Sequence, residues 1–259
     1  MLTWNLDPTK ILMRHELAAV LADLNGRARS GQARLNRAIL RLACCCGLRV
    51  SEIAGLRLAD VCLAGPRPHV RIRVCVAKGG RSRRVPLWWD AGTLADLVAW
   101  RAERVAEGGR DADPFICSVQ AHRRGQPLQR HALRRRFLTA CKALGRDRLR
   151  MLTIHHGRHT FISHALAGGR TLAEVRDAAG HSSVLVTSAS ACRSGGRRGG
   201  WLPVPGQVSR LLFVPVIGCY GYAVFGYSDP LDPLTELRQR LDRVLRPLRA
   251  GIAWAPDAV

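Results

Sequence analysis

The chain has 259 residues and 47% of them are hydrophobic, so it can fill a core, and global disorder is not expected. Its formal net charge of +22 lies mostly within the first 190 residues and favours a polyanionic partner; the open alternative is a GC-rich genome that places arginine wherever a solvated cation is tolerated. No stretch reaches the roughly 18 uninterrupted apolar residues of a membrane span, and the first residues lack an export signal, so we expect a cytoplasmic protein with no membrane partner.

Apolar residues at helical spacing dominate the N-terminal part of the sequence. Residues 1–10 are expected to form a loose lead-in, followed by helices over 11–24 and 35–46. The second helix is apolar around much of its circumference, which predicts that it is buried. Gly47 ends it, and Ser51 is a candidate N-cap for the short helix that comes next.

The periodicity changes to alternation after Pro68. Apolar residues alternate with others over 70–76, which predicts a strand with one buried face, and residues 82–87 are expected to return beside it. Lys78 and the two glycines after it supply the turn. The sequence therefore predicts a small antiparallel sheet with Lys78 at its edge.

The segments after this hairpin are expected to be helical. Helices are predicted over 91–106, over the very basic stretch 130–144, over 160–167, and from a capping box at Thr171 to the glycine before His181. Together with the hairpin they predict a mainly helical α+β fold.

Residues 11–190 are predicted to form this α+β domain. Beyond Ser190 the composition changes abruptly to a stretch rich in Arg, Gly and Ser, followed by an apolar stretch that contains proline. We expect residues 191–259 to be an atypical, poorly packed tail with one candidate helix over 234–245.

Nine cysteines are present, but no two have CxxC spacing. Neither a zinc ribbon nor a redox motif is indicated, and cysteine is expected to act as a small hydrophobe in a reducing compartment. We therefore predict no metal site.

Five residues suit chemistry at a phosphodiester. Arg49 lies between two helices, Lys78 at a hairpin tip, His155 and Arg158 near the start of a helix, and His181 directly after a helix. Arginine binds two phosphate oxygens with its planar fork, and neutral histidine can donate a hydrogen bond or accept a proton. Each residue alone is more often solvated or structural. Their joint occurrence, in matching structural contexts, predicts a site.

Four stretches, in this order, resemble the catalytic core of the tyrosine recombinases, the phage-integrase family: residues 47–52 (GLRVSE), 78–80 (KGG), 155–160 (HHGRHT) and 180–183 (GHSS). The resemblance implies the DNA breaking-rejoining fold of that family. It assigns catalytic roles to Arg49, His155, Arg158 and His181, with Lys78 as the general acid.

The resemblance also implies a reaction and partners. The family cleaves and rejoins double-stranded DNA through a 3′-phosphotyrosyl intermediate, in site-specific recombination or integration of mobile elements, without metal or other cofactor. A homo-oligomer on DNA is expected for the family. Family members also usually carry a DNA-clamping helical domain ahead of the catalytic one. Only about ten residues precede the first predicted helix here, so that domain is expected to be absent.

The nucleophile departs from the family pattern. The family places its tyrosine about nine residues after the last motif histidine, where this chain has Ser190. A serine hydroxyl ionises far less readily than a phenol, so cleavage is expected to be impaired. Two alternatives are open. A tyrosine of the tail could fold back to act as the nucleophile, or a reading-frame shift near codon 188 could have replaced the segment that carried the tyrosine. The chain's tyrosines are Tyr220, Tyr222 and Tyr227.

The sequence leaves three possible functions for this chain. The first is a DNA strand-transfer enzyme with an impaired cleavage step, and the second is a non-catalytic DNA-binding remnant. The third, a basic RNA-binding protein, lacks an aromatic stacking platform because only 5% of residues are aromatic. Two basic faces are expected to contact DNA: Arg81, Arg83 and Arg84, and Arg134, Arg135 and Arg136.

Overall fold

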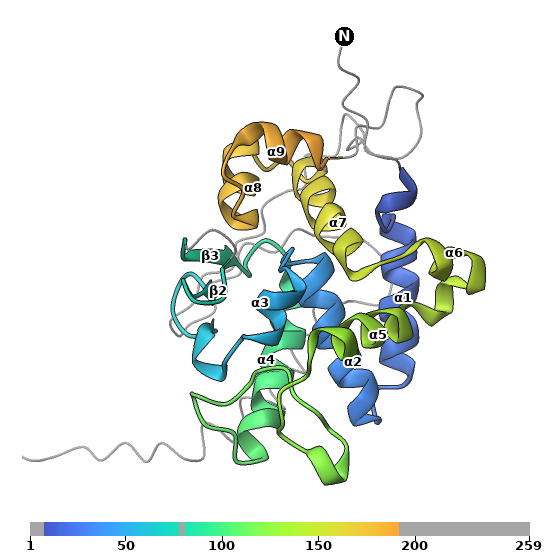
Figure 1. The fold of residues 1–259 in the computed structure, drawn as a ribbon, viewed down its shortest axis with the longest axis vertical. Coiled ribbons are helices and arrows are strands. Elements are labelled where there is room, and N and C mark those ends of the chain that lie inside the picture. Colours follow the sequence, from blue (N-terminus) through green and yellow to red (C-terminus); the bar gives the residue numbers. More distant parts are fainter. Residues whose placement is uncertain (1–7, 78–80, 192–259) are drawn as a thin grey trace, which may run out of the picture. The chain divides into compact units, whose positions relative to one another are not determined.

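The computed structural model describes residues 8–77 and 81–191 (Figure 1). All of them belong to one compact unit, Met1–Val204. Lys78 and the candidate helix over 234–245 lie outside the described residues. No helix in the two described ranges combines the length and the apolar character that a membrane crossing requires.

The described chain is mainly helical with a small antiparallel sheet, as predicted. The strands pair in the order β1-β2-β3 and are β1 (Val61–Cys62), β2 (His69–Ile72) and β3 (Arg83–Pro86). The α-helices are α1 (Arg14–Gly26), α2 (Gly31–Cys44), α3 (Val50–Ala54), α4 (Ala91–Ala106), α5 (Arg130–Ala140), α6 (Arg146–Met151), α7 (Ile154–Ala167), α8 (Leu172–Ala179) and α9 (Val184–Ala189). Short 3₁₀ helices cover Pro8–Lys10, Leu58–Asp60, Ala121–Arg123 and Cys141–Leu144.

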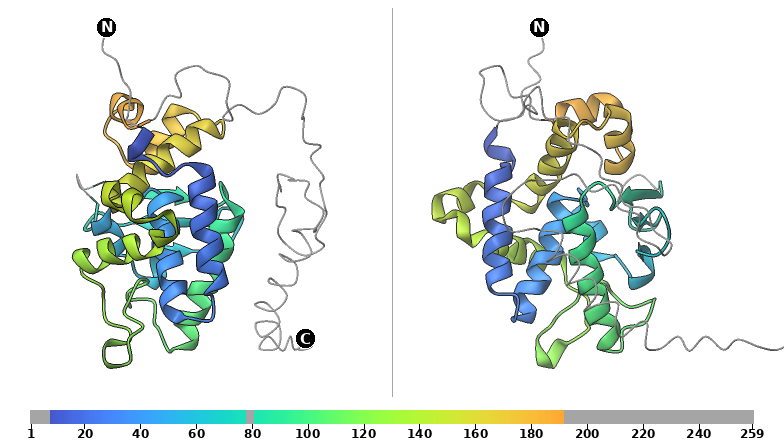
Figure 2. Two further views of the ribbon diagram at one scale, coloured as in Figure 1. Left: turned by 90° about the vertical axis from the view of Figure 1, so that its right-hand side faces the viewer. Right: turned by 180° about the vertical axis from the view of Figure 1, so that it is seen from behind.

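Helix α2 lies at the centre of the main core. It packs against α7, α5, α4 and α1, and α1 and α2 run side by side in Figure 2. Leu35, Ile39 and Leu42 on α2 are fully buried, as the apolar circumference predicts. Two polar side chains of the same helix, Asn36 and Arg41, are buried as well.

A second, smaller apolar cluster joins α7 and α8. Phe161 and Ile162 from α7 pack there with Val175 from α8 and with Ala191. The ring of Trp89, just after β3, stacks on Phe161 with 6.0 Å between ring centroids. Helix α7 therefore connects the main core to the α8–α9 region.

Several predicted elements have other bounds in the structure: α1 begins at Arg14 and not at residue 11, α2 is Gly31–Cys44 and not 35–46, and α5 ends at Ala140, where a 3₁₀ helix follows. Two further differences have a clear physical reason. Strand β2 stops at Ile72 and not at residue 76, because the next side chain, Arg73, turns back to bond Asp60 (Nε to Oδ2, 2.8 Å) and the Gly55 carbonyl (2.7 Å). Helix α7 begins at Ile154 and not at residue 160. Gly157 weakens the local helical signal, but its missing side chain lets α7 approach α2 closely: a Cβ there would lie 3.0 Å from that of Ala43.

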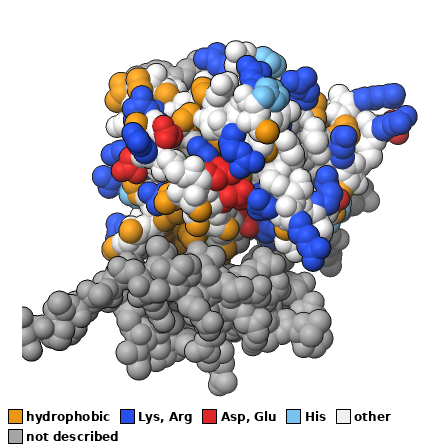
Figure 3. Space-filling model, turned by 90° about the horizontal axis from the view of Figure 1, so that it is seen from below, with side chains coloured by type: hydrophobic (Ala, Val, Ile, Leu, Met, Phe, Trp, Pro, Cys, Tyr) orange, Lys and Arg blue, Asp and Glu red, His pale blue; other side chains and the backbone are white. Residues whose placement is uncertain are grey.

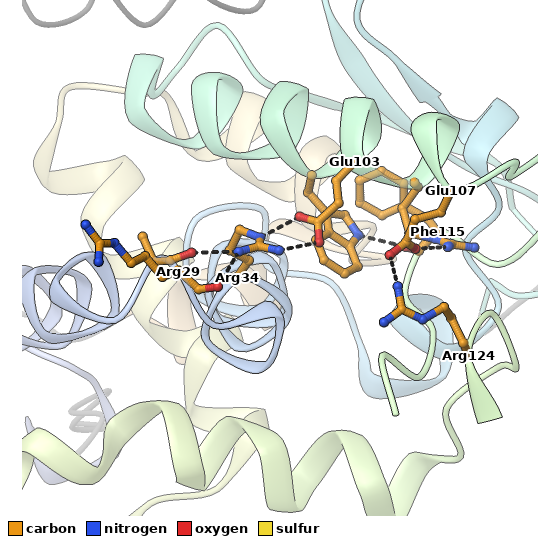
Figure 4. Close-up of polar contacts among 9 residues, drawn as sticks. Arg29, Arg34, Glu103, Glu107, Phe115 and Arg124 are labelled. Carbon is orange, nitrogen blue, oxygen red and sulfur yellow. Dashed lines mark hydrogen bonds and ion pairs between the residues drawn. The ribbon is translucent and has the colours of Figure 1, made fainter. Parts of the chain in front are cut away.

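Several arginines form ion pairs that join elements of the fold. Arg34 on α2 donates to both carboxylate oxygens of Glu103 on α4, at 2.6 and 2.7 Å (Figure 4). Glu107, the C-cap residue of α4, accepts from Arg104 at 2.9 Å and from Arg124 at 2.7 Å. On the face drawn in Figure 3, basic side chains are likewise interspersed with acidic ones. These arginines are therefore neutralised by carboxylates within the fold, and the excess of +22 is carried by the basic residues that remain.

Candidate active site

Arg49 is held at the start of α3 by Glu52. Arg49, not Ser51, is the N-cap residue, and its backbone N–H donates to Glu52 Oε2 at 2.8 Å. Its guanidinium donates to Glu52 Oε1 at 3.1 Å and to the Gly180 carbonyl at 3.3 Å. The side chain keeps 21% of its surface exposed, so it is both fixed and reachable from solvent.

Glu52 is fully buried and bonds a second arginine, Arg83. Both Arg83 Nη atoms donate to the carboxylate at 2.8 Å, and Arg83 Nε donates to the Ala178 carbonyl at 2.9 Å. Burial acts to raise the pKa of Glu52, but the hydrogen bonds and charge of Arg83 and Arg49 lower it overall, so the carboxylate is ionised.

The burial of Arg83 corrects one expectation. The sequence places Arg83 on an exposed DNA-binding face, but only 8% of its side chain is exposed. Strand residues two apart share a face, and Val85 is fully buried, so Arg83 points inward while Arg84 points to solvent.

Arg158 lies on α7 and is almost completely buried. Its Nη1 donates to the Gly47 carbonyl at 2.8 Å and its Nη2 to the Ala179 carbonyl at 2.5 Å. Gly47 has a φ of +64°, and a Cβ there would lie only 2.4 Å from the ring of Phe161, so glycine is required where α7 passes.

His181 follows α8 directly, after Gly180 ends that helix in the left-handed conformation (φ +69°). Its Nδ1 lies 3.0 Å from the hydroxyl of Thr187, a buried residue of α9. Burial, together with the positive charges of Arg158 and Arg49, lowers the pKa of His181 to about 3. The imidazole is therefore neutral near neutral pH, and it can donate or accept a hydrogen bond.

Three successive carbonyls at the C-terminal end of α8 bring these arginines together. Residues 178, 179 and 180 accept hydrogen bonds from Arg83, Arg158 and Arg49 respectively. The last carbonyls of a helix have no partner within the helix and carry its negative end, so they attract cations. They thereby hold three guanidiniums from three different elements beside His181.

Arg49, Arg83 and Arg158 form an arginine cluster, and this cluster has an excess of positive charge. Glu52 is the only carboxylate, within the described part of the chain, that forms a salt bridge with Arg49 or Arg83, and Arg158 forms none there. Burial and the charges of Arg49 and Arg83 lower the pKa of Arg158 to about 9, against the opposing effect of Glu52. A bound oxyanion would supply the missing negative charge.

A cavity of about 480 Å³ opens beside this cluster. Arg49 and Arg158 line it together with His155 and, from α5, Arg134. His155 is exposed, and its ring meets that of His159 edge-on with centroids 5.0 Å apart. In residues 8–77 and 81–191 no group of three or more His, Cys, Asp or Glu is arranged to hold a metal ion.

The remaining predicted DNA contacts divide into two groups. Arg81, Arg84 and Arg135 are exposed. Arg136 is only partly exposed and turns toward α2, where it donates to Gln32 and to Asn36 (3.3 Å).

Comparison with known families identifies this arrangement. The model of the phage integrase family matches residues 10–190. The chain belongs to the phage integrase family.

Curated relatives carry the names of tyrosine recombinases. The chain is 32% identical to tyrosine recombinase XerC of Rhodospirillum centenum over 59% of this chain and 40% of the relative. It is 34% identical to XerC of Pseudomonas entomophila over 60% and 47%, and 29% identical to XerD of Halalkalibacterium halodurans over 69% and 55%. The chain thus spans about half the length of these relatives.

Solved structures share the fold. The XerA recombinase matches with a TM-score of 0.55 and 20% identity, over 70% of this chain and 57% of that one. XerH bound to difH substrate, in a pre-cleavage complex, matches with a TM-score of 0.55 and 22% identity, over 72% and 50%. The described residues therefore have the tyrosine-recombinase catalytic-domain fold.

Ser190, where the sequence predicts the family's tyrosine, is the C-cap residue of α9. The Ser190 hydroxyl donates to the Val186 carbonyl at 2.8 Å, and its own carbonyl lies 3.3 Å from His159 Nδ1. The hydroxyl is thus bonded back into its own helix.

Three residues of this site were not singled out from the sequence. They are Glu52 as the shared carboxylate, Thr187 as the partner of His181, and His159 as the contact of Ser190. The three-residue spacing from Arg49 to Glu52 is a capping-box distance and is a usable signal. The other two contacts depend on how α7, α8 and α9 pack.

Three partly buried histidines predict acid sensitivity. Burial is the largest cause that lowers the pKa of His181 to about 3 and those of His159 and His164 to about 4. Below about pH 6.5 the unfolded chain takes up protons on these residues and the folded chain does not, so the free energy of unfolding falls as the pH drops.

Urea unfolding, measured between about pH 7 and pH 5, tests this prediction. The carboxylates whose pKa values are lowered contribute mainly below about pH 5, because the unfolded chain protonates them near their ordinary value of 4.5. The variant His181→Asn should weaken the dependence on pH. A free energy of unfolding that stays constant or rises toward pH 5 would contradict the burial of neutral histidines.

Proposed function

We propose that this chain binds double-stranded DNA and that Arg49, Arg158 and His181 hold one phosphodiester of its backbone. The observation that carries the proposal is the convergence of three guanidiniums on the end of α8, where only Arg49 and Arg83 share a carboxylate, that of Glu52. Such a site is incomplete without an anion, and a DNA phosphate has the charge and the acceptor geometry to complete it.

We propose that the pocket keeps the groups with which the family breaks and rejoins DNA, apart from the tyrosine nucleophile. Attack at phosphorus spreads negative charge over the non-bridging oxygens, which Arg49 and Arg158 would stabilise. Neutral His181 would donate a hydrogen bond to the same phosphate, and His155 reaches the cavity from the exposed side. Lys78 remains the proposed general acid.

The duplex is proposed to lie over the exposed basic side chains of Arg81, Arg84, Arg134 and Arg135. The solved XerH relative is named as bound to its difH substrate, which supports a double-stranded DNA partner for this chain. Arg136 and Arg83 contribute less to this surface because they are engaged by other parts of the fold.

We propose that the cleavage step is lost in this chain. Ser190 occupies the position where the family has its tyrosine. The Ser190 hydroxyl donates a hydrogen bond to the Val186 carbonyl. An aliphatic hydroxyl without an adjacent base is a weak nucleophile. The chain is thus a DNA-binding member of the family that retains the phosphate pocket.

Incubation with nicked suicide duplexes of randomised sequence tests this function. We expect binding that weakens steeply with salt, and no covalent protein–DNA adduct after denaturation. The double variant Arg49→Gln/Arg158→Gln is the matched control and should bind more weakly. An adduct formed by the unaltered chain would show that another residue serves as nucleophile. Absence of duplex binding would refute the DNA partner.

A further inference from the structure

Arg83 connects three elements that carry the site. It lies on β3, its two Nη atoms bond Glu52 on α3, and its Nε bonds the Ala178 carbonyl at the end of α8. The side chain is 8% exposed.

We propose that Arg83 is a positioning residue for the phosphate pocket. It fixes Glu52 and the end of α8 relative to each other, so that Arg49 and His181 face the same phosphate. This inference rests on the proposed function, because it assumes that a phosphate binds there.

The first link runs from Arg83 to Arg49. The Glu52 carboxylate, oriented by two bonds from Arg83, accepts from both the backbone N–H (2.8 Å) and Nη1 (3.1 Å) of Arg49. A rotation of this carboxylate would therefore move the guanidinium of Arg49.

The second link runs from Arg83 to His181. Ala178, whose carbonyl accepts from Arg83 Nε, and Gly180 both lie just before His181. A Cβ at Gly180 would lie 2.7–2.9 Å from Cδ, Nε and Nη1 of Arg83, so this arginine packs directly against the Gly180 backbone. The backbone just before His181 therefore packs against the Arg83 side chain.

Lysine cannot make the same set of contacts. The guanidinium is a rigid planar fork that reaches both carboxylate oxygens and a carbonyl at once, whereas an ammonium is a point charge on a flexible stem. Arg83→Lys therefore keeps the positive charge but loses the simultaneous hydrogen bonds to Glu52 and to the Ala178 carbonyl. The variant thus separates a positioning role from a purely electrostatic one.

The test compares tungstate binding, by titration calorimetry, among folded variants of the full chain. We expect Arg83→Lys to lower the affinity for tungstate by about tenfold. Glu52→Gln/Arg83→Gln removes both charges of the buried pair, avoids an unpaired ion, and should show a similar loss. The control Arg71→Gln, on the neighbouring strand with 50% of the side chain exposed, should bind as the unaltered chain does.

A second readout separates positioning from fold stability. In the unaltered chain, tungstate should shift the imidazole resonances of His181, and in Arg83→Lys this shift should be reduced. If Arg83→Lys lowers only the melting temperature and leaves tungstate affinity unchanged, the positioning role is refuted. If Arg158→Gln loses tungstate binding while both Arg83 variants retain it, the proposed pocket stands and this inference fails. If the unaltered chain binds no tungstate, both fail.

Discussion

Replacing Glu52 with alanine is expected to lower the free energy of unfolding by about 3–5 kcal/mol. The carboxylate is fully buried and accepts four hydrogen bonds from Arg49 and Arg83. Its removal leaves the Arg83 guanidinium buried without its counter-ion. Because domains are stable by only about 5–15 kcal/mol, urea denaturation followed by circular dichroism should show a large loss.

Asp23→Ala is the matched control for Glu52→Ala. Asp23 pairs with Arg27 one turn along α1, and 36% of its side chain is exposed. Exposed ion pairs contribute little, so the change should stay below about 1 kcal/mol. A Glu52→Ala variant as stable as this control would mean that the buried carboxylate does not hold the arginine cluster together.

Arg49→Gln and Arg158→Gln are expected to weaken duplex DNA binding by about tenfold each, and not additively. Both arginines are proposed to bind the same phosphate, beside the end of α8. Each single variant should reduce the slope of log affinity against log salt by about 0.9, the value for one phosphate. The double variant should reduce it no further. Fluorescence anisotropy over a salt series measures both quantities.

Arg84→Gln and Arg135→Gln provide the contrast. These exposed residues lie on β3 and α5 and are proposed to meet different phosphates, so their effects should add. The double variant should lower the salt slope by about 1.8. Additive behaviour of Arg49→Gln and Arg158→Gln would show that the two side chains do not share a phosphate.

The predictable part of the fold follows from local sequence patterns. The helix at 91–106 and the capping box at Thr171 depend on nearby residues, and both are present with those bounds. The antiparallel hairpin is also present, but β2 is shorter than its alternating pattern predicts. There a long-range bond from Arg73 to Asp60 overrides the local preference.

The predicted site residues Arg49, Arg158 and His181 lie around one helix end, and His155 lines the cavity that Arg49 and Arg158 also line. The resemblance of their motifs to those of the phage-integrase family carried this information. The alternation of Arg83 with Val85 is a usable sign that Arg83 shares the buried face of β3. Its partners, Glu52 and the Ala178 carbonyl, depend on how β3, α3 and α8 pack and have no local signal.

Anomalous diffraction from crystals soaked in tungstate would test the central claim most directly. Tungstate is a tetrahedral oxyanion, like the phosphate that it replaces, and tungsten gives a strong anomalous signal. If these three residues bind one phosphate, a tungsten peak should lie within hydrogen-bonding distance of Arg49, Arg158 and His181. Tungstate bound only on the exposed arginines of α5 or β3, with this pocket empty, would contradict it.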